Sequence, residues 1–460
     1  MPLELDVAMW AEQQFGSCEL GDGRRTSRAV KMARQFAAHP SGSTPEQTES
    51  WSDCKAAYRL FDQEDVSFVA LATPHWRQTR ARQRGHFLLL DDTTTISFDG
   101  DRQISGLGIV TDSSAQGYRL HSALMVDAHD GEILGLAGQT IHYRQAVPKK
   151  EKQRQRLLRY RASEIWGEVV DQIGPAPNAE VHWTHVCDRG ADNFEVYCHF
   201  LLQRTDGVVR AAQRTRLVRV GDDTRQLQQS LKSLAVRGTY SLEVTANSHP
   251  VARTAEVEVR FGTIAIPVPR DCGRFAKECG ITLITMNVIE VQEVHPPAGS
   301  QALRWVLLTS PVVQTFELAL GVIGYYERRP LVEEFHKALK TGCRIEDRLD
   351  EAARRWENVT AMLTIVAVRL LQWKTIAVKE PDRPAATVVP HGWLQMLHVL
   401  SGSKRKQIVT ARDFLRALAG LGGHLGRKSD GEPGWITIWR GFNKLHLLLR
   451  GAAAMSKRCG

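Results

Sequence analysis

A continuous apolar run, Phe87–Leu90, leads directly into the acidic and hydroxyl-rich stretch Asp91–Thr95. An apolar run without alternation predicts a strand that is buried on both faces, which is the central kind of strand in an α/β sheet. Further strand-like runs cover residues 119–126, 131–140 and 180–187. The last of them ends in Asp188, so the sequence predicts an α/β fold in which two strands end in aspartate.

The regions around these strands have different patterns. The start of the chain and the part after Pro311 carry apolar residues at helical spacing, whereas Thr254–Phe261 alternates with period two. Such alternation predicts antiparallel sheet with one wet face, inserted within the α/β region. We therefore expect a helical N-terminal domain over residues 1–75, an α/β domain over 76–375 with a β-rich insertion at about 206–300, and a helical C-terminal domain over 376–460.

The composition is that of a folded, basic chain. The 460 residues carry 60 Lys and Arg against 51 Asp and Glu, a net charge of +9, and 43% of them are hydrophobic. This hydrophobic content excludes a disordered chain, and no run approaches the roughly 18 apolar residues of a membrane span. No secretory signal follows Met1 and the eight cysteines form no CxxC pair, so we expect a reducing cytoplasm and no structural zinc. The positive charge permits a nucleic-acid partner without requiring one.

Carboxylates at the ends of neighbouring strands point into one crevice, where open α/β sheets bind ligands. Asp92 and Asp188 are the candidates here, and Asp91 competes with Asp92 because adjacent strand residues point to opposite faces. A helix is expected from Pro330, since proline is tolerated at a first helical position, and it carries Glu333. Taken singly, each of these residues is usually a turn, a cap or a solvated helix face.

Together the three carboxylates predict phosphoryl-transfer chemistry. Asp92, Asp188 and Glu333 could hold two divalent cations about 3.5–4 Å apart, an arrangement that stabilises the attacking and leaving oxygens of an in-line displacement. Mg²⁺ suits such a site because it takes few carboxylates and completes its shell with water and substrate phosphate. The basic residues near Glu333 would then contact a DNA backbone.

At this point the sequence resembles a known family, the bacterial insertion-sequence transposases with a DDE active site and a Y-R-E-K signature. The signature is matched by Tyr326-(x2)-Arg329-(x3)-Glu333-(x6)-Lys340. Three further motifs of the family stand in the right order, namely Asp92-Thr93-Thr94, Cys187-Asp188-Arg189 and Trp305-Val306-Leu307-Leu308-Thr309. The resemblance covers nearly the whole chain. Two positions depart from it: Pro330 stands where relatives often carry tryptophan, and Gly190 where close relatives carry glutamate.

The resemblance implies a ribonuclease-H-like catalytic core with a β-rich insertion, flanked by helical N- and C-terminal domains. It implies cut-and-paste transposition, in which DNA ends are nicked, closed through a hairpin and joined to target DNA. The implied catalytic and metal-binding residues are Asp92, Asp188 and Glu333, with two Mg²⁺ ions for which Mn²⁺ can substitute. The implied partners are terminal inverted repeats, target DNA and a second copy of the chain, in a bacterial cytoplasm close to the nucleoid.

The predicted DNA contacts fall into three groups. The resemblance assigns Tyr326, Arg329, Lys337 and Lys340 to phosphates near the cut, and Trp305 to a base flipped out of the duplex. Arg210 and Arg214, on the strand that opens the insertion, are weaker candidates. In the N-terminal domain the basic cluster supplies Arg24, Arg25 and Arg28.

Two other functions compete with an active transposase. One is a catalytically silent or inhibitory derivative that keeps DNA binding or dimerisation, and the other is a metal nuclease that lacks strand transfer. The three intact carboxylates argue against the first, and the basic N-terminal domain and the Trp-rich tail argue against the second. The tail carries an apolar stripe at helical spacing, for which we expect pairing with a second copy. Its members are Ile436, Trp439, Phe442, Leu445, Leu448 and Leu449.

Overall fold

The computed structural model describes most of the chain. The described residues are 7–98, 104–110, 115–144, 150, 152, 161, 163–244, 253–270, 272, 274–297, 299, 301–401, 408–427 and 430–459. The helices are α1 (Val7–Phe15), α2 (Gly23–Ala38), α3 (Thr44–Gln47), α4 (Trp51–Phe61), α5 (Phe68–Arg80), α7 (Ile165–Ile173), η1 (Arg189–Ala191), α8 (Phe194–Gln203), α9 (Leu227–Lys232), α10 (Arg274–Glu278), α11 (Phe316–Glu327), α12 (Pro330–Lys337), η2 (Ala338–Gly342), η3 (Ile345–Asp347), α13 (Ala353–Lys379), η4 (Ala385–Thr387), α14 (His391–Ser401), α15 (Ala411–Leu421) and α16 (Trp435–Cys459).

The strands are β1 (Gly85–Phe98), β2 (Gly108–Ile109), β3 (Gln116–Asp127), β4 (Ile133–His142), β5 (Val181–Cys187), β6 (Asp206–Arg210), β7 (Leu217–Val220), β8 (Asp223–Gln226), β9 (Val236–Val244), β10 (Arg253–Pro267), β11 (Leu283–Glu293) and β12 (Arg304–Thr309). Across the described residues they form one mixed sheet of twelve strands, in the order β2-β3-β1-β5-β6-β12-β11-β10-β7-β8, with β4 paired to β3 and β9 to β10.

The centre of the sheet mixes both strand directions. β1 pairs antiparallel with β3 and parallel with β5, and β5 pairs parallel with β6. Helices α7 and α8 pack on one face of these strands, and α5, α12 and α13 on the other. Leu88, Leu89 and Leu90 are completely buried between these two layers, which is why the apolar run lacks alternation.

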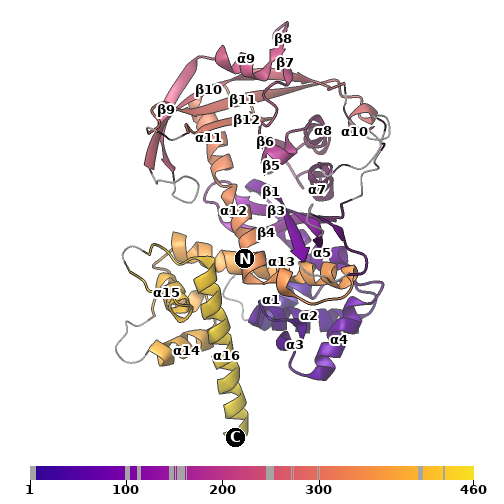
Figure 1. The fold of residues 1–460 in the computed structure, drawn as a ribbon, viewed down its shortest axis with the longest axis vertical. Helices are drawn as coiled ribbons and strands as arrows, with labels where there is room; N and C mark the ends of the chain where they lie inside the picture. The colour runs from indigo at the N-terminus through magenta and orange to yellow at the C-terminus, as the bar shows by residue number, and fades with distance from the viewer. Residues whose placement is uncertain are drawn as a thin grey trace.

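The β-rich segment predicted at about 206–300 extends this sheet. β6 and β12 pair antiparallel, and β11, β10, β7 and β8 follow outward from β12 (Figure 1). In β10 the burial alternates along the strand, as the period-two pattern of Thr254–Phe261 predicts.

One expectation about β1 is wrong. The strand does not end at Asp91 but continues to Phe98, because it keeps antiparallel pairing with β3 as far as Phe98↔Gln116. Its parallel pairing with β5 does stop, at Leu90↔Val186. Asp92 therefore lies two residues beyond the last parallel pair, at the same height as Asp188 after β5.

Helix α13 is the centre of the remaining core. It contacts α2, α4, α5, β4, α12 and α15, and one hydrophobic cluster runs from Trp10 through Leu90 and Trp356 to Phe442. By length and composition α13 could cross a membrane, but 78% of its most apolar window is buried inside the protein. Since the N-terminal helices and the sheet share this core, the division at residues 75 and 375 stays a prediction.

The predicted apolar stripe lies on α16, and its residues differ in burial. Trp439, Phe442 and Leu445 are buried against their own domain, where Phe442 stacks on Trp439 with ring centroids 5.5 Å apart. Ile436 and Leu448 are 57% and 40% exposed. Helix α16 extends away from the body of the molecule toward the C-terminus (Figure 1). Leu449 is partly buried and packs against the same core. Most of the stripe therefore serves the fold, and only Ile436 and Leu448 of its six members are exposed.

Candidate active site

Three carboxylates from three elements meet at one guanidinium group. Arg329, at the start of α12, places Nη2 2.9 Å from Asp92 Oδ1 and 3.5 Å from Asp188 Oδ2. Its Nη1 lies 2.6 Å from Glu333 Oε1, one helical turn along. The structure thus brings together the three predicted catalytic carboxylates, one from β1, one from the end of β5 and one from α12.

Asp91 faces the opposite side of the sheet. Its carboxylate accepts a hydrogen bond from His185 Nδ1 at 2.8 Å and lies 3.7 Å from His121 Nε2. Burial opposes ionisation, but the charges and hydrogen bonds of both histidines outweigh it and hold the pKa of Asp91 below its usual range. Asp91 is 1% exposed, so it belongs to a buried polar cluster under α7 and α8.

The electrostatics keep Asp92 ionised. Burial raises the energy of its charge, yet the hydrogen bond from His336 and the charge of Arg329 lower the pKa of Asp92 overall. Burial likewise disfavours the charge on Arg329, and the carboxylates of Asp92 and Asp188 more than compensate, so the pKa of Arg329 is raised. Asp188 and Glu333 are more open, with side chains 37% and 48% exposed.

Asp188 has two roles in this geometry. Its Oδ1 accepts from Gly190 N at 2.6 Å and caps the short η1 turn, which is the ordinary role of an aspartate after a strand. Its other oxygen faces Arg329. The turn is tightly packed, because a Cβ at Gly190 would lie 2.9 Å from Trp166 Cζ2 and 3.0 Å from Asp188 Oδ1. The glutamate that the family resemblance would place here would require this packing to shift.

A groove of about 1220 Å³ opens beside the carboxylates and runs under the β-rich insertion. Of the described residues that line it, six are arginines and three are glutamates. The arginines are Arg189, Arg210, Arg214, Arg253, Arg304 and Arg329. Arg253 and Arg304 are paired with Glu293 and Glu290, and Arg329 with the three site carboxylates. The lining arginines that could meet an anion are therefore Arg189, Arg210 and Arg214. Both predicted insertion contacts, Arg210 and Arg214, are among them.

Aromatic side chains form one wall of the groove. Trp305, on β12, is half-buried and meets Tyr326 edge-on with ring centroids 5.8 Å apart. Tyr326 is 7% exposed, and burial raises the pKa of its phenol. Both side chains line the groove, Trp305 with part of its ring exposed and Tyr326 almost fully buried beside it.

The two predicted lysines lie outside the described lining of the groove. Lys337 Nζ is 2.8 Å from Glu334 Oε1, and Lys340 Nζ is 3.1 Å from Glu346 Oε1. Helix α12 changes to a π-helical turn at Ala338, and such turns are frequent at functional sites. The π turn breaks the i, i+4, i+7 spacing that would have aligned Lys340 with Glu333. Lys337 precedes this turn and is paired with Glu334, so neither lysine contacts a site carboxylate in these ion pairs.

His336 is a site residue that the sequence reasoning did not select. It is 7% exposed, its Nδ1 lies 3.5 Å from Asp92 Oδ2, and its Nε2 has no partner among the described residues. Its position three residues after Glu333 on the same helix was the available signal.

The donor set fits a hard divalent cation, since three carboxylates supply only oxygen ligands and already converge on a positive charge. Within the described part of the chain, no group of three His, Cys, Asp or Glu side chains is spaced to hold a metal ion as it stands. The reason is visible in the contacts, because the Arg329 guanidinium lies between the three carboxylates.

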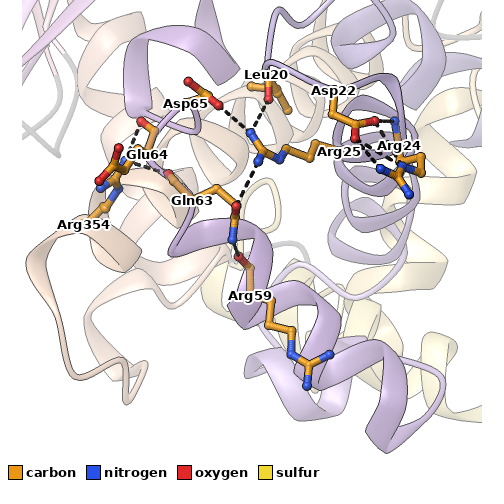
Figure 2. A network of polar contacts seen from close by, with 9 residues as sticks. All are labelled: Leu20, Asp22, Arg24, Arg25, Arg59, Gln63, Glu64, Asp65 and Arg354. Carbon is orange, nitrogen blue, oxygen red and sulfur yellow. Dashed lines mark hydrogen bonds and ion pairs between the residues drawn. The ribbon is translucent and has the colours of Figure 1, made fainter.

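The basic residues of α2 contribute to the fold of the N-terminal domain (Figure 2). Arg25 Nη1 bonds Asp65 at 2.5 Å and the Leu20 carbonyl at 3.0 Å, and its Nη2 bonds Gln63 at 3.0 Å. Arg28 pairs with Asp53 at 2.7 Å. Arg24 pairs with its neighbour Asp22 but keeps 93% of its side chain exposed, so it is the freest of the three for a phosphate.

Comparison with known proteins finds a similarity for the N-terminal helices. Residues 7–66, which span α1 to α4, match the family model described as transposase DNA-binding. This part of the chain is therefore similar to transposase DNA-binding domains. A solved structure, the cryo-EM structure of a piggyBac transposase synaptic complex with hairpin DNA, matches 94% of this chain and 76% of its own, with 10% sequence identity and a TM-score of 0.36. Similarity at that level is too weak to establish a shared fold.

Proposed function

We propose that this chain is a cut-and-paste DNA transposase with a DDE active site formed by Asp92, Asp188 and Glu333. The observation that carries the proposal is the convergence of these three carboxylates on Arg329, beside an arginine-lined groove. The similarity of residues 7–66 to transposase DNA-binding domains supports DNA as the partner. The five strands β4-β3-β1-β5-β6, with β1 antiparallel to β3 and parallel to β5, support a ribonuclease-H-like core.

In this proposal each residue has a physical task. Asp92, Asp188 and Glu333 would hold the divalent cations, which supply charge neutralisation for phosphoryl transfer when bound. The groove arginines would bind the phosphates that flank the cut. Trp305 would stack on a base displaced from the duplex, so that the DNA end can bend sharply into a hairpin.

The order of reactions follows the family that the sequence resembles. Water attacks the transposon end, the freed 3′-hydroxyl attacks the opposite strand, and water opens the resulting hairpin before the 3′ end joins target DNA. We propose that the chain works like the cut-and-paste transposase of the kanamycin-resistance composite transposon. Two copies would hold two terminal inverted repeats, paired through the exposed side of α16.

A cleavage assay tests the proposal. The purified full-length chain is incubated with Mg²⁺ and DNA that carries the inverted repeats flanking its gene. We expect nicks, hairpins and joined products in that order, and none of them with Asp92→Asn. Binding without any cutting would support a silent DNA-binding derivative, and cutting without hairpins or joined products would support a metal nuclease.

A further inference from the structure

The segment after the site helix touches both the catalytic sheet and the DNA-binding domain. We name residues 344–358, which include η3 and the start of α13, the docking segment. On the sheet side, Glu346 Oε1 accepts a hydrogen bond from Ser97 N at 3.0 Å, on the strand that carries Asp92. The same carboxylate pairs with Lys340 at 3.1 Å, which ties the segment to the turn that follows Glu333.

Arg348 anchors the docking segment in the DNA-binding domain. Its guanidinium donates to the Gly42 carbonyl at 2.8 Å, Thr44 Oγ1 at 2.7 Å and Gln47 Oε1 at 3.0 Å. It also lies over the ring of Phe36, 5.1 Å from the centroid. Arg348 is 6% exposed, and burial lowers its pKa. A buried arginine with this many directed bonds defines both position and orientation.

Further contacts hold the C-terminal end of α4 and the loop that follows it. Arg354 Nη2 donates to the carbonyls of Gln63 and Glu64 at 2.6 Å each (Figure 2). Arg355 bonds both oxygens of Asp62 at 2.7 Å. The last carbonyl of α4 itself, that of Phe61, accepts a hydrogen bond from Asn358 Nδ2 at 3.0 Å, so the docking segment also satisfies a helix end that lacks partners inside the helix.

We infer that the docking segment fixes the position of the DNA-binding domain relative to the carboxylates, and thereby sets the nucleotide at which a DNA end is cut. Arg348 acts in this as a positioning residue. The inference rests on the proposed function. Successive phosphates of one strand are about 3.4 Å apart along the duplex, so a displacement of that size changes the cut by one nucleotide. In a symmetric pair, where one copy reads the end that the other cuts, the distance depends on these contacts together with the contact between the two copies, so loosening Arg348 still widens the range of cut positions.

The test maps cut positions at nucleotide resolution with the full-length protein, Mg²⁺ and end-bearing DNA. Arg348→Lys keeps the charge but loses the planar fork. Its cuts should spread by about one nucleotide on either side of the wild-type position, while end binding stays unchanged. The matched control is Arg344→Lys in the same segment, because Arg344 is exposed and bonds Asp347 three residues along at 2.5 Å. This control should cut at the single wild-type position.

Fewer cuts at an unchanged position in Arg348→Lys would overturn the inference, since that is the result of a purely structural role. If Arg348→Lys fails to fold, the double variant Arg354→Ala, Arg355→Ala removes contacts nearer the surface and should give the same spread. If the wild type does not cut, the proposed function fails, and the docking is then read from amide exchange of residues 42–47. Exchange there should be faster in Arg348→Lys than in wild type, and equal rates would overturn the docking as well.

Discussion

Asp91 and Asp92 are neighbours on β1, yet Asp91 bonds His185 beneath α7 and α8 whereas Asp92 bonds Arg329 at α12 on the other face. This pair gives a direct test, because the two substitutions to asparagine should have different effects. Asp92→Asn should abolish cleavage with little change in the free energy of unfolding. Asp91→Asn should cost about 1.5–3 kcal/mol of stability, the usual value of a hydrogen bond to a buried charge. Urea unfolding and cleavage assays on both variants distinguish the two roles. The assignment would be reversed if folded Asp91→Asn protein did not cleave DNA while Asp92→Asn protein still did.

Arg329→Gln should make the stability of the protein depend on divalent cations. Without the guanidinium, three carboxylates repel one another, so the thermal midpoint should fall. A cation that binds the folded state at a hundred times its dissociation constant adds about 2.7 kcal/mol, so Mn²⁺ should restore much of the loss. The thermal midpoint of the wild type should rise less with Mn²⁺, since its carboxylates are already paired with the Arg329 guanidinium. Thermal unfolding with and without Mn²⁺ measures the shift of the midpoint, and an equal shift in Arg329→Gln and wild type would contradict the prediction. Arg344→Gln, which removes an arginine outside the site, serves as the control.

Trp305→Ala should separate nicking from hairpin formation. The ring is half-buried at the groove and contacts Tyr326 edge-on, which leaves surface for a base. Stacking of one base on an aromatic ring contributes about 1–3 kcal/mol, so hairpin formation should slow by about tenfold to a hundredfold while nicking stays almost normal. Product analysis on denaturing gels separates the two steps. An equal decrease in both steps would make Trp305 a structural residue.

Lys340→Ala tests the phosphate contact that the family resemblance assigns to this residue. In the structure Lys340 is paired with Glu346 and 32% exposed, so it would have to exchange that partner for DNA. Loss of one phosphate contact should reduce the slope of log affinity against log salt by about 0.9. Filter-binding titrations over a range of salt concentrations measure the slope. If Lys340→Ala binds and cuts as wild type does, the contact does not exist.

Pairing through α16 is best tested on its exposed side. Truncation after Gly434 would also remove Trp439 and Phe442 from the core, so failure of that variant would have two explanations. Leu447 and Leu448 are 61% and 40% exposed, and Leu447→Glu with Leu448→Glu leaves the buried residues in place. We expect single-end binding to remain while paired-end complexes and cleavage disappear together. Paired complexes that still form on native gels would place the dimer contact elsewhere.

The sequence predicted the elements whose pattern is local. The apolar run before Asp91, the start of α12 at Pro330 and the alternation in β10 follow from burial and backbone preferences that a short window contains. Strand alternation also predicted that Asp91 and Asp92 lie on different faces of the sheet, and the family resemblance selected Asp92 as the site residue. The sequence could not show where β1 ends, because that depends on pairing with β3.

The environment of the site residues was less accessible from the sequence. Arg329 and Lys340 both belong to the signature, yet Arg329 is enclosed by three carboxylates and Lys340 is turned toward Glu346 by a π-helical turn. All three predicted arginines of α2 pair within their own domain, and how exposed each one stays depends on loops that a pattern does not place, as with Arg25 and Asp65. The part played by Arg348 was hidden for the same reason.

The pairing of β6 with β12 has a consequence for how such chains can vary. Val209 on β6 lies opposite Leu308 on β12, so the chain enters the β-rich insertion from β6 and comes back on the strand next to it. Residues 211–303 are thus one very long connection between two paired strands, β6 and β12. The entropy of closing a connection grows only slowly with its length. Evolution could therefore enlarge, shrink or exchange this module without moving the strands that carry Asp92 and Asp188, and the groove would change its shape and charge while the carboxylates stayed where they are.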